Sequence, residues 1–389
     1  MTISHRAEIN PSLLVWARKN SRMDISYAAK KLDFSEQKLI SWESGNEQPT
    51  IKQLRKIAKI YRVNFGVFFL PEPPVIFTTK VQDFRRYHGS TFSDFSPEIY
   101  IDLRSNINTR DIAIELEEDM GIQSQPFQLT CSIDESPSDA AKRIRNYFGI
   151  TFAFQKTFKD TRIAFNTWRE KLSSVGCLVL QSTKIDLGEM RGYSVFYDVK
   201  PIVVVNRKDP YSARTFTLLH ELVHLMLHSS GLCDLHANTN MPAHEQKLEV
   251  FCNHVAAQAL VPDEYLLSYS ATRSTDSESW TDAIVGPIAR DFGVSREVIL
   301  RRLLDHGLTT RSFYEENRER FRQEVEISKK RSKGGFVTPA VDAISSKGKP
   351  FVSLVVDAMN SSVITQSDAS DYLGVKAKHF AKIELAVEG

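Results

Sequence analysis

Apolar and polar positions alternate with the period of a helix over the first 70 residues, interrupted at short intervals by capping and turn residues. Four such stretches begin at Asn10, Asp24, Ser35 and Thr50, each of which favours the start of a helix. A short apolar run, residues 65–70, follows as a fifth element. The pattern therefore predicts five short helices at the amino end of the chain.

The period changes after this region. Two consecutive prolines after Glu72 forbid a continuous helix and predict a domain boundary near residue 74. Residues 75–160 are mostly helical in pattern. Three short runs rich in β-branched residues then predict a small antiparallel sheet, at residues 176–181, 193–197 and 201–206.

Two longer helices are predicted after the sheet, at residues 213–228 and 245–260, the second stopped by Pro262. Helical pattern resumes at residues 284–306, and a Gly/Lys/Ser-rich segment precedes a last small region. The fold class we predict is α+β and mostly helical. The predicted domains are a five-helix module at 1–74, a helical connector at 75–160, a domain with the sheet at 161–310 and a carboxyl-terminal region at 311–389.

Composition supports several domains. The chain has 389 residues, of which 42% are hydrophobic and 25% charged, too many for one core and too apolar for a disordered chain. Its net charge of +2 is uneven, since residues 1–75 hold 12 Lys and Arg against 7 Asp and Glu. This excess permits a polyanionic partner at the amino end, and a solvated basic face fits it equally well.

The cysteines indicate the compartment. Cys131, Cys177, Cys233 and Cys252 lie far apart without a CxxC pair, so neither a disulfide framework nor a zinc ribbon is predicted. No apolar run approaches the length of a membrane span. We expect a cytoplasmic protein without a membrane partner.

The most informative residues are His220-Glu221-Leu222-Val223-His224, in the middle of an apolar helical stretch. Four residues make slightly more than one helical turn, so His220 and His224 project from one face and can bind one Zn²⁺. Glu221 is placed to reach a water on that ion. Burying these side chains in an apolar helix is costly unless a partner satisfies them, which favours a metal site over two core histidines.

A catalytic zinc usually has three protein ligands and one open position. The helix predicted at 245–260 offers Glu245, Glu249 and, less plausibly, His254. Spacing alone does not choose between the two carboxylates.

The sequence HELVH followed by EVFCNHVAAQALVP resembles the ImmA/IrrE family of zinc metallopeptidases. The resemblance implies that Glu249 is the third ligand and Asn253 its polar companion. The preceding stretch VVVNRKDPYSARTFTLLHE is also similar to the family, which places Asn206 and Arg214 around the site. His228 fits the family pattern as a capping or supporting residue.

This ligand set implies a zinc-dependent endopeptidase in which Glu221 takes a proton from a water activated by zinc and passes it to the leaving amine. The group that stabilises the oxyanion is left open among Tyr193, Tyr197, Tyr211 and Arg214.

The first 70 residues resemble the XRE/Cro-type helix-turn-helix, through Ala29, Phe34, Trp42, Gly45 and Pro49. The resemblance implies that the third helix enters the major groove of DNA. The side chains that it would present are Ser35, Gln37, Lys38 and Ser41.

Three positions depart from that family. Ile25 stands where many such repressors have Gln, Asp33 replaces the turn glycine, and Glu36 places an anion near the DNA. Asp tolerates left-handed turn geometry, so we expect the fold to persist and residues 10–70 to bind DNA. The alternative is a protein-docking module that kept the fold.

A later segment, DASDYLGVKAKHF, has the Ala-to-Gly-Val spacing of a helix-turn-helix, but the spacing alone is too weak to assign it.

These observations together predict a zinc endopeptidase, joined to a DNA-binding module, that cleaves a repressor or antitoxin-like regulator. The alternatives are a transcriptional regulator whose zinc site is sensory or structural, and the toxin member of a toxin-antitoxin pair.

Overall fold

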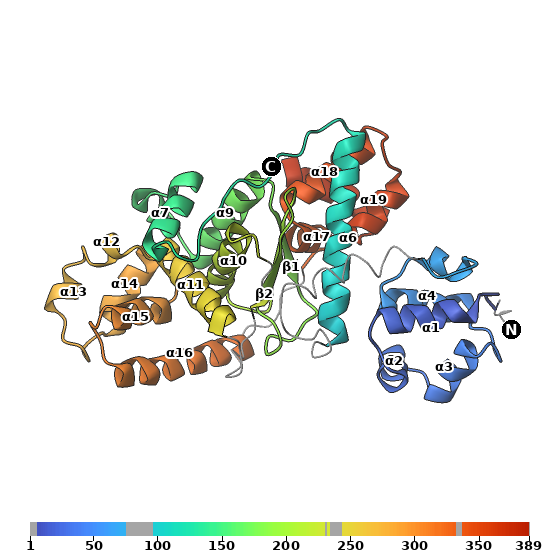
Figure 1. Ribbon diagram of the computed structural model, residues 1–389, viewed down its shortest axis with the longest axis horizontal. Coiled ribbons are helices and arrows are strands. Elements are labelled where there is room, and N and C mark those ends of the chain that lie inside the picture. The colour runs from blue at the N-terminus through green and yellow to red at the C-terminus, as the bar shows by residue number, and fades with distance from the viewer. Residues whose placement is uncertain (1–5, 75–95, 230–231, 234–242, 332–336, 389) are drawn as a thin grey trace. The chain divides into compact units, whose positions relative to one another are not determined.

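The computed structural model describes residues 6–74, 96–229, 232–233, 243–331 and 337–388. It has two compact units, Met1–Thr109 and Arg110–Gly389, whose elements are labelled in Figure 1. The boundary between them falls within helix α6 (Pro97–Asp119). Helices dominate both units, as the sequence pattern predicts, although the predicted helical pattern of residues 75–95 lies outside the described residues. None of the described helices is long and apolar enough to cross a bilayer.

The first unit begins with the five predicted helical elements. They are α1 (Pro11–Asn20), α2 (Ile25–Leu32), α3 (Glu36–Glu43), α4 (Ile51–Tyr61) and the 3-10 helix η1 (Phe65–Phe69). The side chains of Asn10, Asp24, Ser35 and Thr50 each accept a hydrogen bond from the first turn of their helix, which confirms the predicted helix starts. The buried apolar faces of α1 to α4 and η1 form one core around Leu32, Leu39 and Trp42.

The turn between α2 and α3 has the left-handed geometry expected at Asp33, whose φ is 54°. The Phe34 backbone N–H donates to the Ala29 carbonyl at 3.0 Å, and the Phe34 ring packs edge-on against Trp42. The loss of glycine at this turn therefore leaves the two-helix geometry intact.

A four-stranded sheet lies at the centre of the second unit, in the order β1-β3-β2-β4. Its strands are β1 (Leu178–Ser182), β2 (Gly192–Val195), β3 (Ile202–Asn206) and β4 (Leu232–Cys233). β1 pairs with β3 in parallel, and β2 pairs with β3 and β4 antiparallel. The predicted antiparallel pairing is therefore confirmed for β2 with β3 and was wrong for β1 with β3, so the sheet is mixed. The chain brings β3 back between β1 and β2, so β1 lies at one edge of the sheet, where α9 and α17 cover it.

Helix α10 (Tyr211–Met226) packs against β2 and β3 and is flanked by α9 (Thr161–Ser174) and α11 (Ala243–Leu260). α7 (Pro137–Phe148) covers the other side of α11, and α17 (Pro339–Lys347) packs on β1. Figure 1 shows α10 beside the sheet with α11 next to it. The remaining elements are α8 (Phe152–Gln155), α12 (Asp263–Leu266), α13 (Ala271–Ser274), α14 (Asp282–Phe292), α15 (Arg296–Asp305), α16 (Arg311–Arg331), α18 (Lys349–Asn360), α19 (Gln366–Leu373), η3 (Ala377–His379) and α20 (Phe380–Glu388).

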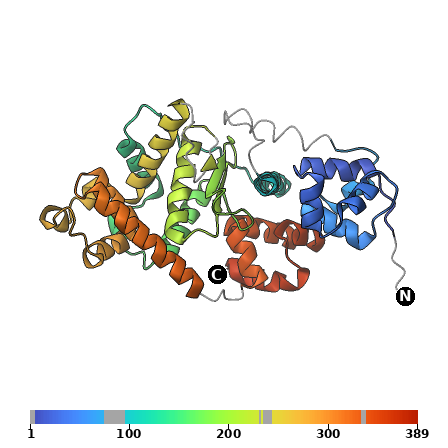
Figure 2. The same ribbon diagram turned by 90° about the horizontal axis from the view of Figure 1, so that it is seen from below.

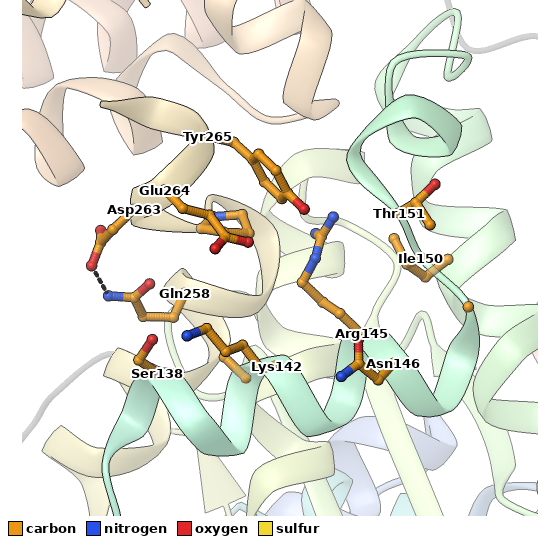
Figure 3. Close-up of a pocket in the computed structure, with 13 residues that line it drawn as sticks. Ser138, Lys142, Arg145, Asn146, Ile150, Thr151, Gln258, Asp263, Glu264 and Tyr265 are labelled. Carbon is orange, nitrogen blue, oxygen red and sulfur yellow. Dashed lines mark hydrogen bonds between the residues drawn. The ribbon is translucent and has the colours of Figure 1, made fainter. Parts of the chain in front are cut away.

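A buried polar pair fixes the carboxyl end of α11. The Arg145 guanidinium donates to Gln155 Oε1 at 2.7 Å and to the Ala259 carbonyl at 2.8 Å. The Gln155 amide donates to the Leu260 and Phe292 carbonyls, both at 2.8 Å. The last carbonyls of a helix lack partners within it, so this pair satisfies them and anchors α11 to its neighbours. Figure 3 shows Arg145 rising from α7 toward Tyr265 in the adjacent pocket.

Gly192 allows β2 to approach α10 closely. A Cβ at this position would lie 2.4 Å from Thr217 Cγ2 and 2.7 Å from the Val204 carbonyl oxygen, and 3.7 Å from Glu221 Cγ. Both close neighbours belong to packed elements, so the absence of a side chain at Gly192 sets the distance between the strand and the helix.

Gly192→Ala should therefore destabilise the second unit. We expect a loss of about 1–3 kcal/mol, the usual cost of overpacking a core, and a lower Tm in thermal unfolding followed by circular dichroism. Gly286→Ala is the matched control, because a Cβ there meets nothing within 4 Å and alanine favours the helix. Equal Tm values for the two variants would contradict the close packing.

Candidate metal centre

Helix α10 is buried over its whole second half, so its polar side chains face protein rather than water. His220 and His224 project from the same face, with ring centroids 4.9 Å apart and Nε2 atoms 3.1 Å apart. This is the arrangement predicted from their spacing of four residues.

Glu249 of α11 completes a cluster with the two histidines. Its Oε2 lies 3.3 Å from His220 Nε2 and its Oε1 lies 3.1 Å from His224 Nε2. Ligand atoms about 2.0–2.1 Å from a tetrahedral zinc are about 3.3–3.4 Å from one another. The three side chains are therefore spaced as one face of a zinc coordination sphere.

The chemistry of the three donors also fits a metal. Two imidazole nitrogens and a carboxylate are a common ligand set for catalytic zinc. The side chains of His220 and His224 are 1% and 2% exposed, whereas that of Glu249 is 26% exposed. The cluster is thus closed on the side of α10 and open on the side of Glu249, where a fourth ligand from solvent or substrate has access.

Glu221 lies beside the cluster and is fully buried. Its Oε2 accepts a hydrogen bond from Ser194 Oγ of β2 at 2.7 Å. Its Oε1 is also buried and accepts no hydrogen bond from any residue that the structure describes. Ser194 therefore fixes one carboxylate oxygen and leaves the other available to a proton.

The electrostatics of the cluster follow from burial and from the paired charges. Burial raises the pKa of Glu221, and the nearby imidazoles of His224 and His220 only partly offset it. Burial also disfavours the charged forms of His220 and Glu249, but the hydrogen bonds and opposite charges around them together outweigh it. The pKa of His220 is raised and that of Glu249 is held far below its usual range.

Two candidate ligands of α11 lie outside this cluster. Among the described residues, His220, His224 and Glu249 form the group of His, Cys, Asp or Glu side chains close enough to bind one metal ion. Glu245 and His254 are on the same helix but are not part of it. Asn253, one turn after Glu249, is exposed and forms a hydrogen bond that contributes to the raised pKa of His220.

The Arg214 side chain forms hydrogen bonds with the loop that leads into α10. Its guanidinium donates to the Asp209 carbonyl at 2.6 Å, the Arg207 carbonyl at 2.6 Å and Gln181 Oε1 at 3.0 Å. Asn206 is buried and its amide donates to the Met190 carbonyl at 2.8 Å. Both residues brace the approach to α10.

His228 follows the end of α10 with a φ of 53°. Its N–H donates to the Leu225 carbonyl at 2.9 Å, and its ring stacks on Phe196. It lies in the turn that ends the helix.

The aromatic candidates for the oxyanion occupy different places. Tyr193 is buried in β2, Tyr197 lies under the Arg110 guanidinium, and Tyr211 packs against the Arg214 guanidinium. The group that stabilises the oxyanion stays a prediction.

Sequence reasoning missed Ser194 and Ser229. Ser229 Oγ donates to the His224 carbonyl at 3.0 Å and lies 3.4 Å from His224 Nδ1, where it can orient the ring. The available signal for Ser194 was a polar residue in an apolar strand, but the pairing of β2 with α10 is not visible in the sequence.

The residues predicted to contact DNA lie at the start of α3. Ser35 caps this helix, and its side chain accepts from the Lys38 N–H at 3.3 Å. Ser35, Gln37 and Lys38 are exposed and Ser41 is half-buried. The Lys38 ammonium lies above the rings of Phe34 and Trp42.

A search of curated proteins finds no match to this chain. Residues 177–304 match the model of the family described as the IrrE N-terminal-like domain, Peptidase_M78. The matched span contains the sheet, α10 and α11, and thus His220, Glu221, His224 and Glu249. In this part the chain is therefore similar to the ImmA/IrrE peptidases, which points to a metallopeptidase-like function.

Proposed function

We propose that residues 161–310 form a zinc-dependent endopeptidase that cleaves a regulatory protein, either a repressor or an antitoxin-like partner. The observation that carries this proposal is the combination of a three-ligand cluster, open on one side, with a buried carboxylate that has one unpartnered oxygen. In this proposal His220, His224 and Glu249 bind the ion.

When bound, zinc supplies Lewis-acid polarisation of the peptide carbonyl and acidifies nearby water. Glu221 Oε1 accepts the proton from the attacking water and delivers it to the leaving amine. Ser194 holds Oε2, so the carboxylate keeps one orientation through both transfers. The raised pKa of Glu221 suits a group that must both take and release a proton.

The position of Glu221 favours catalysis over a sensory or structural zinc site. A buried carboxylate oxygen without a hydrogen bond lowers stability. A purely structural zinc site does not require such a group. A regulator with a sensory zinc, or a toxin held in check by a partner, would account for the metal ligands but leave this group unexplained.

We further propose that residues 10–70 bind DNA, with α3 in the major groove. The exposed Gln37 and Lys38 and the intact turn at Asp33 support this role, whereas the exposed Glu36 favours the alternative of protein docking. The wider proposal is a cytoplasmic protein with a binding module at 1–74, a helical connector at 75–160, the peptidase at 161–310 and a carboxyl-terminal region at 311–389.

Glu249→Gln should weaken zinc binding by more than about 100-fold, because loss of even a supporting partner of a ligand costs about 10–100-fold. The measurement is a competition titration with a zinc chelator dye. Glu245→Gln is the matched control on the same helix and should bind zinc as the unaltered protein does. The reverse ranking would make Glu245 the third ligand, and equal affinities would contradict the ligand set.

Glu221→Gln should keep zinc affinity and folding but lose cleavage by about 10²–10⁴-fold, because the amide cannot accept the proton. The assay incubates the purified, zinc-loaded protein with the regulatory protein encoded by the adjacent gene and follows fragments by mass spectrometry. Chelator treatment should stop cleavage by the unaltered protein. Cleavage by Glu221→Gln at the unaltered rate would rule out the proposed mechanism.

Lys38→Glu should weaken binding of the full chain to duplex DNA at low salt, because it replaces a phosphate-binding cation with an anion. Fluorescence anisotropy with a labelled duplex measures the change. Lys59→Glu, an exposed charge on α4 away from the turn, is the control. If the Lys38→Glu and Lys59→Glu proteins bind equally, α3 does not face DNA.

A further inference from the structure

Near the carboxyl end, α19, η3 and α20 repeat part of the local structure of α2 and α3, with the 3-10 helix η3 in the place of the first turn of α3. α2 and α19 both have eight residues, and each is capped by a side chain, Asp24 in one and Thr365 in the other. Each ends at a left-handed residue, Asp33 with φ 54° and Gly374 with φ 66°. The corresponding residues are separated by one constant offset along the chain.

The turns after these helices have the same hydrogen bonds at the same positions. In the first turn, the Phe34 N–H donates to the Ala29 carbonyl at 3.0 Å and the Asp33 N–H donates to the Lys30 carbonyl at 3.3 Å. In the second turn, the Val375 N–H donates to the Ser370 carbonyl at 3.1 Å and the Gly374 N–H donates to the Asp371 carbonyl at 3.3 Å. In each turn, the two hydrogen bonds end the first helix and turn the backbone in the same direction.

The buried apolar positions also coincide. The equivalent buried pairs are Ala28 and Ala369, Leu32 and Leu373, Leu39 and Phe380, and Trp42 and Ile383. Two of each set lie on the first helix and two on the second. Such a set buries the inner faces of two helices joined by a short turn and leaves the outer face of the second one free.

The second helix of this repeat is held in place by its own core. α20 packs on α17 and α18, and α19 packs on α18 and η3. Phe351, Val352 and Val355 of α18 are buried. Figure 2 shows these carboxyl-terminal helices in red as one cluster. The helix pair is therefore supported on one side and presents the other to solvent.

The exposed stretch from the turn through η3 to the start of α20 is basic. Residues 374–383 contain three lysines, one histidine and no Asp or Glu. Lys376, Lys378 and Lys382 are all exposed. The equivalent stretch of α3 has one lysine and also carries Glu36. This stretch thus has no acidic residue at the position of Glu36, and the acidic residues of the pair lie outside it, at Asp368 and Asp371 in α19 and at Glu384 and Glu388 in α20.

The small residues of this face fit a groove. Ala377 and Ala381 are exposed between the lysines, and they let a backbone approach closely. Alanine methyl groups can contact the methyl group of thymine, while lysines neutralise phosphates on either side.

We propose that residues 365–388 form a second helix-turn-helix that binds double-stranded DNA, with the segment 376–382 in the major groove. Lys376, Lys378 and Lys382 contact the phosphates. This site goes beyond the proposed peptidase and beyond the amino-terminal module, and it gives the carboxyl-terminal region a function.

The test measures binding of the full chain to a fluorescein-labelled duplex of mixed sequence by anisotropy, over a series of salt concentrations. Lys378→Glu and Lys382→Glu should each weaken binding by at least about tenfold and make the salt dependence shallower by about one unit per lysine. Lys349→Glu is the matched control, because Lys349 is exposed on α18 in the same cluster. Thermal unfolding checks that each variant is folded.

The same titration in a Lys38→Glu background separates the two modules. If Lys378→Glu and Lys382→Glu bind DNA like Lys349→Glu in both backgrounds, the inference is overturned, and the amino-terminal module alone accounts for binding. A full chain that does not bind the duplex at low salt overturns both DNA-binding proposals. Additive losses from Lys38→Glu and Lys382→Glu support two separate DNA contacts.

Discussion

The second unit depends on one interaction, the convergence of His220, His224 and Glu249 in a mostly buried place. Each of these groups costs stability when it is removed from water alone. Together they satisfy one another, as the raised pKa of His220 and the depressed pKa of Glu249 show. The cluster joins α10 to α11 through polar atoms, where the rest of their interface is apolar. The same pairing that makes the helices compatible also creates the metal-binding geometry.

The supports around this cluster are distributed over the fold. Arg145 and Gln155 satisfy the end of α11, and Arg214 braces the loop that enters α10. Each supporting side chain binds backbone carbonyls rather than the cluster itself. Their contribution is to fix the two helices, because a displacement of about 1 Å is enough to lose the function of such a site.

Local features of this fold were predictable and nonlocal ones were not. The caps at Asn10 and Asp24 and the pairing of His220 with His224 depend on residues a few positions apart, so the sequence shows them directly. The parallel pairing of β1 with β3 depends on the path of the chain through the whole sheet, and the two-residue strand β4 is too short to leave a pattern. Glu249 could be separated from Glu245 only through a family resemblance, since both have the helical spacing. Ser194 could not be found, because its partner Glu221 comes from another element.

Strand β2 has only four residues, and its alternation decides which side chains meet α10. The Ser194 side chain points toward the helix, and Gly192 lies on the same face of the strand. Tyr193 between them lies on the opposite face. A slip of one residue in the pairing of β2 with β3 would exchange these faces. A phenol ring would then occupy the space where Gly192 admits the helix, and Glu221 would lose its hydroxyl donor. The chemistry of the metal centre thus depends on the register of a strand that contributes no metal ligand.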